Sequence, residues 1–320
     1  MNRNRSGIGS LTSRWHGGAT EEPLLIHRPP SRREVVLGSA LAAATALAAG
    51  PALVAALRAD GAPRRVPALD ARPTGPAPAS LAIADLTWTD VRDAVSRGWR
   101  TVLVPTGGLE GNGPHLAIGK HDRVVHWAAL RIAEALGDAL VAPVVSYVPE
   151  GGYDPPSGHM VHPGTLGVTE AVFEGVLDGV ARSLKAGGFG TVCFLSDHGG
   201  SLPAQARVAA RLSAEWSGTG PLVLGVDAYY SDTLESEALL ARGEPRAALG
   251  QHAGLADTAE LMAVDPAAVD LGRVPASADD LARLGGSGDP RRATAALGGA
   301  LMALRVDAAV AQIRAARRTA

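Results

Sequence analysis

The stretch Pro105–Asp122, PTGGLEGNGPHLAIGKHD, decides the fold and contains the first candidate site. It follows the apolar run Thr101–Val104, which is typical of a buried strand. Its glycines and prolines predict a loop whose backbone turns tightly where that strand ends. The stretch brings five polar residues together: Glu110, Asn112, His115, His121 and Asp122. A carboxylate and imidazoles so close together are candidate ligands of a divalent metal, and a polar surface loop is the alternative.

The composition predicts one large globular domain with appended segments. The chain has 320 residues, of which 46% are hydrophobic, and its net charge is -2. This length is enough for one sizeable core. Because the chain has no basic excess, nucleic acid is not expected as a partner. The single cysteine, Cys193, cannot form an internal disulfide, and its apolar neighbours indicate a buried position.

Residues 1–60 have the layout of an export signal. The pair Arg32-Arg33 precedes an alanine- and leucine-rich run to Leu57 and resembles a twin-arginine signal. We therefore expect the protein to be exported. Its expected location is periplasmic, extracytoplasmic or membrane-anchored. An uncleaved membrane anchor is the alternative, because the apolar run is close to the ~20 residues that span a bilayer. Residues 61–80, rich in proline and alanine, predict a linker, and residues 81–320 predict the folded domain.

Apolar runs and helical repeats alternate along the predicted domain. The predicted strands are 101–104, 140–148, 191–196 and 221–226. The predicted helices are a segment capped by Thr87 or Thr89 that ends near residue 97, then 126–136, 169–186, 203–216, 257–264 and 294–318. This alternation predicts the α/β class, with a three-layer α/β/α sandwich around a mostly parallel sheet. Ligands of such sheets bind beyond the carboxyl ends of the strands.

Other candidate residues lie farther along the chain. His198 directly follows the predicted strand 191–196 and precedes two glycines, which allow the backbone to approach a ligand closely. His252 lies close to Asp257, for which a helix cap is the alternative role. The loop 150–165 contains Tyr153 and His159, and we expect it to cover the site, with His159 pointing inward.

Four motifs, in order, resemble the creatininase family. They are Glu110-Gly-Asn112-Gly-Pro-His115-Leu, His159-x-x-His162-Pro-Gly-Thr, Ser-Asp-His198-Gly-Gly and His252-Ala-Gly-x-x-Asp257-Thr. The resemblance spans about residues 85–310 and implies that residues 81–320 form a creatininase-like catalytic domain. It also implies an α/β/α core, a metal-dependent amidohydrolase that often binds two divalent metals, and a homo-oligomer, either a trimer or a hexamer.

The sequence departs from the family pattern at metal ligands. Asn112 stands where the pattern has a histidine, and His121 stands where it has the aspartate that bridges two metals. Leu255 replaces the glutamate of the His-Ala-Gly-Glu motif. A neutral imidazole has one nitrogen free to bind a metal, so His121 cannot bridge two ions as a carboxylate does.

These departures lead us to expect one divalent ion, either zinc or one of manganese and iron. The expected ligands are Glu110, His121 and His198. A competing account retains a second ion through Asp122 and Asp257.

The expected activity is hydrolysis of a C–N bond in a small cyclic or linear amide by a metal-activated water. The resemblance implies that His252 passes a proton to the leaving nitrogen, with Asp257 orienting it or acting as base. We expect His115 to help stabilise the oxyanion. The expected substrate contacts are His159, Tyr153 and Asn112. The alternatives are a binding protein of this family that has lost catalysis, and a metal-dependent peptidase or lyase on the same fold.

Overall fold

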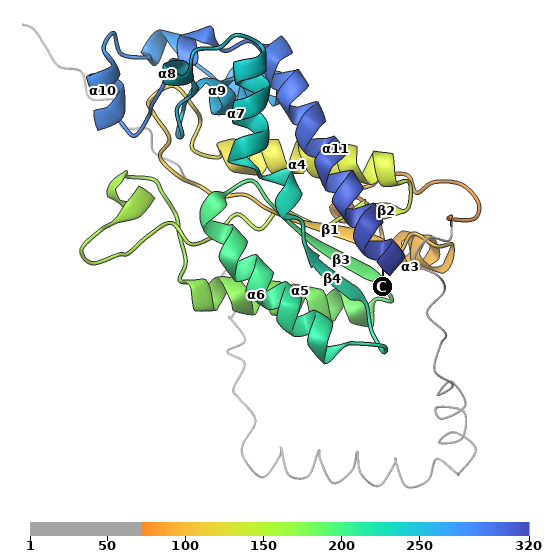
Figure 1. Ribbon diagram of the computed structural model, residues 1–320. Helices are drawn as coiled ribbons and strands as arrows, with labels where there is room; N and C mark the ends of the chain where they lie inside the picture. Colours follow the sequence, from red (N-terminus) through yellow and green to blue (C-terminus); the bar gives the residue numbers. More distant parts are fainter. Residues whose placement is uncertain (1–71, 320) are drawn as a thin grey trace, which may run out of the picture. The chain divides into compact units, whose positions relative to one another are not determined.

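The computed structural model describes residues 72–319 (Figure 1). The predicted signal, and the predicted linker up to residue 71, lie outside the described residues. The described strands are β1 (Thr101–Thr106), β2 (Ala139–Val141), β3 (Thr191–Ser196) and β4 (Leu222–Gly225). The described α-helices are α3 (Trp88–Ser96), α4 (Lys120–Leu136), α5 (Glu170–Ala186), α6 (Leu202–Glu215), α7 (Asp232–Ala241), α8 (Arg246–Leu249), α9 (Leu255–Val264), α10 (Ala278–Arg283) and α11 (Ala295–Thr319).

The sheet of the described domain is parallel throughout, with the strand order β2-β1-β3-β4. The two central strands, β1 and β3, pair along their full length, from Thr101 with Thr191 to Thr106 with Ser196. Their carboxyl ends therefore lie at the same level. The loops that follow these two strands begin side by side at one edge of the sheet.

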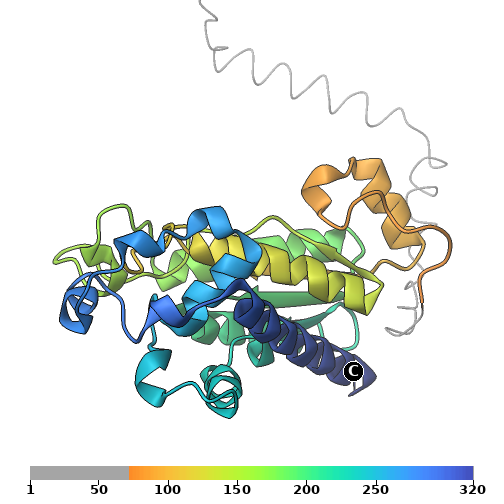
Figure 2. The ribbon, with the colours of Figure 1, turned by 90° about the horizontal axis from the view of Figure 1, so that it is seen from above.

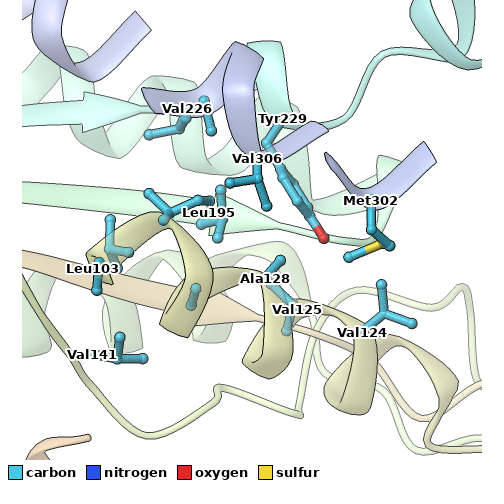
Figure 3. Packing of buried hydrophobic residues seen from close by; sticks show 14 of the residues in the cluster. Leu103, Val124, Val125, Ala128, Val141, Leu195, Val226, Tyr229, Met302 and Val306 are labelled. Carbon is cyan, nitrogen blue, oxygen red and sulfur yellow. The ribbon is translucent and has the colours of Figure 1, made fainter. Parts of the chain in front are cut away.

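Helices cover both faces of the sheet, which confirms the predicted three-layer α/β/α architecture (Figures 1 and 2). Alternate residues of a strand point to opposite faces. Leu103 and Leu195 pack with α4 and α11 on one face, as Figure 3 shows. Val104 and Phe194 pack with α3, α5 and α6 on the other face. The sheet is thus buried on both sides, as its continuous apolar runs predict.

Helix α4 is longer than predicted, and its start determines where His121 lies. The predicted helix begins at residue 126, whereas α4 begins at Lys120, after Gly119. The buried face of α4 includes His121, Val125 and Ala128, at helical spacing. The same face that packs on the sheet therefore carries His121 to the carboxyl edge of the strands.

Two further features of the fold differ from the prediction. Strand β2 ends at Val141, and the chain then contacts β1 through isolated backbone hydrogen bonds at Ala142 and Val145, whereas Val148 pairs with Gly167. Pro143 explains the interruption, because proline has no N–H to donate to a regular ladder. The short helices α7, α8 and α10 were not predicted. They belong to the connections on either side of α9.

Helix α11 is a core helix that packs closely against α9. It is long and apolar enough to cross a membrane, but 44% of its most apolar window is buried inside the domain. The close approach occurs at Gly298, where an added Cβ atom would lie 1.8 Å from the carbonyl oxygen of Ala259. The next residue, Gly299, has no atom of another residue near its Cβ position.

The paired glycines of α11 give a matched stability test. We expect Gly298→Ala to lower the free energy of unfolding by about 1–3 kcal/mol, because the new methyl group collides with the backbone of α9. We expect the control Gly299→Ala to raise it by about 0.5–1 kcal/mol, through the lower flexibility of alanine in the unfolded chain. Urea denaturation measures both. Equal stabilisation by the two substitutions would contradict the packing of α11 on α9.

Candidate metal centre

The candidate centre lies at the switch point of the sheet. After β1 the chain crosses to the face covered by α4, and after β3 it crosses to the face covered by α6. Where neighbouring parallel strands send their connections to opposite faces, a crevice opens beyond their carboxyl ends. Glu110 follows β1, and Asp197 and His198 follow β3, so their side chains enter this crevice from two adjacent strands.

Three imidazoles converge on the buried carboxylate of Glu110. The Nε2 atom of His121 lies 2.8 Å from Oε1 of Glu110. The Nε2 atoms of His198 and His159 lie 3.2 Å and 3.3 Å from Oε2. In each ring it is the Nε2 atom that faces the carboxylate. The carboxylate of Glu110 is thus the group that all three histidines contact.

The other nitrogen of each ring has a partner that fixes its orientation. Nδ1 of His121 lies 2.8 Å from a carboxylate oxygen of Asp197, and Nδ1 of His159 lies 3.3 Å from the carbonyl oxygen of Gly111. Both partners only accept hydrogen bonds, so Nδ1 carries a proton in both rings. Nδ1 of His198 lies 3.2 Å from Oγ of Ser201. Outer partners of this kind hold metal-binding histidines with Nε2 available to the ion.

Within residues 72–319, two groups of three donors could hold a metal ion, and they share Glu110. One consists of Glu110, Glu150 and His198, all buried, and the other of Glu110, His159 and His252. In each group the donor atoms lie within 4.8 Å of one another. Carboxylate and imidazole donors in this mixture suit zinc, manganese or iron.

Glu150 gives an independent reason to expect a cation here. Both of its carboxylate oxygens are buried and have no hydrogen-bond partner among residues 72–319, although Oε2 lies 3.3 Å from Nε2 of His198. Burial lowers the pKa of His198, but the carboxylates of Glu110 and Glu150 outweigh it and raise the pKa to about 9. The two carboxylates therefore favour positive charge between them, and a divalent ion meets that requirement.

Glycines make room for the Glu150 side chain. An added Cβ atom at Gly108 would lie 2.7 Å from Oε1 of Glu150, and one at Gly167 would lie 2.9 Å from Cβ of Glu150. Gly108 has a φ of 155°, which side chains rarely adopt. The lack of a side chain at Gly108 and Gly167 thus allows the backbone to lie close to the buried carboxylate of Glu150.

A buried network of ion pairs and hydrogen bonds around Arg305 holds Asp197, which contacts His121 of the centre. Arg305 of α11 donates to Oδ1 of Asp197 at 2.5 Å and to Oε2 of Glu260 at 2.7 Å. The hydroxyl of Tyr229 also donates to Asp197, at 3.0 Å. Burial alone would raise the pKa of Asp197, but Arg305 and His121 keep it below its ordinary value. Asp197 therefore stays ionised and holds the His121 ring in place.

A second ionic contact lies beside Glu110. The Nζ atom of Lys120 is 2.8 Å from Oδ2 of Asp257, and both side chains line the crevice. Asn112 donates to Oε1 of Glu110 at 2.9 Å and lies 3.5 Å from Asp257. Asn112 is buried and positions Glu110, and it is not among the residues that line the cavity.

The crevice contains a cavity of about 360 Å³. Its walls include Lys120, Glu150, His159, His198, His252 and Asp257. A second cavity of about 370 Å³ adjoins it and shares the wall formed by Tyr230, Gln251, His252 and Asp257. The site can therefore take a small molecule, or one end of a longer one.

The predicted ligands come together, but not as the predicted set of three. Glu110 and His198 belong to the buried donor group, whereas His121 belongs to neither group. The reason is that Nε2 of His121 faces Oε1 of Glu110, whereas the Nε2 atoms of His159 and His198 face Oε2. Asp122, the ligand of the competing account, instead accepts a hydrogen bond from the backbone N–H of Gly108 at 3.0 Å.

Three residues predicted to act in the site, namely Asn112, His115 and Tyr153, lie outside the cavity walls. His115 is buried, and its Nε2 atom lies 3.0 Å from Oγ1 of Thr258, so it supports the first turns of α9. The ring of Tyr153 is half exposed, and its hydroxyl donates to the carbonyl oxygen of Gly167. None of the three therefore lines the cavity in which the expected substrate would lie. His159, His252 and Asp257 do line the cavity.

Sequence reasoning missed Glu150, Lys120 and the network of Arg305. Glu150 carried a usable signal, because it follows the apolar run 140–148 just as Glu110 follows an apolar run. Lys120 and Arg305 carried none, because each lies on a helix whose buried face brings it to the crevice.

Comparison with known proteins identifies relatives of the whole domain. The sequence profile of the creatininase family, described as creatinine amidohydrolase, matches residues 84–313. The mycofactocin precursor peptide peptidase of Mycolicibacterium smegmatis is 32% identical over 221 residues, which cover 67% of this chain and 84% of that protein. The creatinine amidohydrolase of Pseudomonas putida is 27% identical over 203 residues, 61% of this chain and 76% of that protein. These relatives confirm the prediction of a hydrolase.

Solved structures agree with the fold. A crystal structure of creatinine amidohydrolase superposes with a TM-score of 0.59 at 22% identity, covering 73% of this chain and 97% of that one. Two creatininase structures described as Zn-Zn type and as Mn superpose with TM-scores of 0.59 and 0.58. Because the family profile matches most of the chain, and because the strand order, crevice and motifs agree with the predicted fold, the protein belongs to the creatininase family.

Proposed function

We propose that this protein is a metal-dependent hydrolase that cleaves the C–N bond of an amide in the crevice beyond β1 and β3. One observation carries the proposal, namely that the Nε2 atoms of three histidines face the buried carboxylate of Glu110 at 2.8–3.3 Å. Burial lowers the pKa of His121, but the carboxylates of Glu110 and Asp197 on either side of the ring outweigh it and raise the pKa. The Glu110 carboxylate therefore attracts positive charge to this position, and a metal cation supplies that charge.

We assign two ions to the two donor groups, rather than the single ion expected from the sequence. Glu110 can serve both groups, because His198 and His159 both face its Oε2 atom, and a carboxylate oxygen has more than one lone pair, whereas a neutral imidazole has one free nitrogen. The group with Glu150 and His198 is fully buried, whereas the group with His159 and His252 is partly exposed. We therefore expect the first ion to bind more tightly. Bound ions of this kind activate water and polarise a carbonyl group.

The side chains of the crevice supply the remaining requirements of hydrolysis. The contacts of Nδ1 with Gly111 in His159 and with Ser201 in His198 orient the rings so that Nε2 faces the centre. Burial lowers the pKa of His252, so this ring is neutral near pH 7 and can ligate an ion or accept a proton. The volume of about 360 Å³ suits a small cyclic amide or the end of a linear one.

A peptidase is the second candidate function. The relative at 32% identity is named a peptidase, and the adjoining cavity of about 370 Å³ gives room for further residues of a peptide. A panel of cyclic amides and short peptides, assayed with zinc or manganese, separates the two functions. Turnover of cyclic amides alone supports the amidohydrolase, and turnover of peptides alone supports the peptidase.

Metal removal tests whether any such activity depends on the centre. We expect a chelator to abolish hydrolysis and stoichiometric zinc or manganese to restore it, because the water nucleophile needs the ion. The same assay includes elemental analysis before and after chelation. Full activity in protein shown to be free of metal would contradict the proposal.

Glu150 tests the buried donor group. We expect Glu150→Gln to weaken metal binding by more than ~100-fold and to reduce hydrolysis in parallel, since the amide cannot replace the anionic ligand. The matched control is Glu134→Gln, at an exposed position beside Arg131, which should change neither quantity. Metal titration with a competing chelator gives the affinities. An unchanged affinity for both ions in Glu150→Gln would remove Glu150 from the site.

A further inference from the structure

Lys120 is an unusual residue for this chain and for its position. The chain contains two lysines, Lys120 and Lys185. Lys185 lies near the end of α5, where its Nζ atom is 4.4 Å from the centre of the Trp216 ring. Lys120 lies in the first turn of α4, is 2% exposed and lines the cavity next to Glu110. Burial of an ammonium group is costly unless its charge and its hydrogens are satisfied.

Lys120 has an ion-pair partner for its charge, but its N–H groups lack hydrogen-bond acceptors among the described residues. Its Nζ atom lies 2.8 Å from Oδ2 of Asp257, yet it has no well-aligned hydrogen-bond acceptor among the described residues. The same oxygen of Asp257 already accepts a hydrogen bond from the backbone N–H of Ala253 at 2.8 Å. An ammonium group carries three N–H donors. Donors therefore remain for an acceptor that enters the cavity.

The carboxylate of Asp257 fixes the position of the Lys120 ammonium group and favours its charged form. Asp257 is in direct contact with it, and Glu110 and Asp197 also attract the ammonium group. Helix α4 fixes the backbone, because His121, next to Lys120, is held by Asp197 and Glu110. A hydrogen-bond donor held rigidly beside a metal centre can stabilise negative charge that develops on a substrate oxygen in the transition state.

We propose that Lys120 donates a hydrogen bond to the carbonyl oxygen of the scissile amide, and that Asp257 positions it. This rests on the proposed function. As the oxygen of water bonds to the carbonyl carbon, the π electron pair moves onto the carbonyl oxygen, and Lys120 stabilises this oxyanion while keeping its own proton. The carbonyl then re-forms, the C–N bond breaks, and the departing nitrogen takes a proton that came from the water.

Kinetics of lysine variants test the role. We expect Lys120→Met to reduce kcat by about 10²–10³-fold, the usual loss for one oxyanion donor, with a smaller effect on KM. Metal content should stay at the wild-type level, and Lys120→Arg should recover part of kcat because it restores a charged donor. The matched control, Lys185→Met, should leave kcat unchanged. A kcat within about threefold of wild type in Lys120→Met, at full metal content, would overturn the proposal.

Nuclear magnetic resonance tests the contact without using catalysis. In the metal-loaded wild-type chain labelled with [ε-13C]lysine, two lysine side-chain signals are expected. Inorganic phosphate serves as a tetrahedral oxyanion probe. We expect titration with phosphate to shift the Lys120 signal and leave the Lys185 signal in place. The Lys120 signal is the one missing in Lys120→Arg, or the one that Asp257→Asn shifts.

The outcomes separate the two proposals. A phosphate-dependent shift of the Lys120 signal supports the donor role even if no amide in the panel is hydrolysed, in which case only the proposed function fails. Hydrolysis together with a Lys120 signal that does not move at saturating phosphate overturns the donor role alone. A failure of phosphate to bind the metal-loaded chain also counts against the donor role.

Discussion

The carboxylate of Glu110 facing three imidazole nitrogens is the interaction on which the rest of this structure depends. Such an arrangement is unfavourable unless positive charge lies among the donors. The protein nevertheless builds it in a buried position and fixes the outer nitrogen of each ring. Glu150 adds a second buried carboxylate, whose oxygens accept no hydrogen bond from the described residues. The site is therefore organised for cations, in a chain that belongs to a family of hydrolases.

The fold holds these donors through elements that are far apart in the sequence. The register of β1 and β3 ends both strands at one level, so that Glu110 and His198 meet. Helix α11 brings Arg305 under Asp197, and Asp197 orients His121. The close packing of α11 on α9 at Gly298 thus contributes to the site as well as to stability.

The sequence predicted the layers of the fold and the edge of the sheet that carries the site, because both depend on local patterns. Apolar runs followed by glycine and a polar residue correctly located Glu110 and His198. The directions of side chains within loops depend on tertiary contacts, so His115 and Tyr153 could not be placed. The start of α4 was set too late, which hid the fact that Lys120 and His121 lie on its buried face. Glu150 stands at the start of the predicted loop 150–165, and only the tertiary structure shows that its carboxylate turns inward beside His198.

The central claim is that Glu110 is shared by two metal ions, one with Glu150 and His198 and the other with His159 and His252. Anomalous X-ray diffraction from crystals of the zinc- or manganese-loaded chain tests it most directly. The account predicts two peaks roughly 3.5–4 Å apart, with the Glu110 carboxylate between them. A single peak coordinated by Glu110, His121 and His198, or peaks that do not contact Glu110, would contradict it.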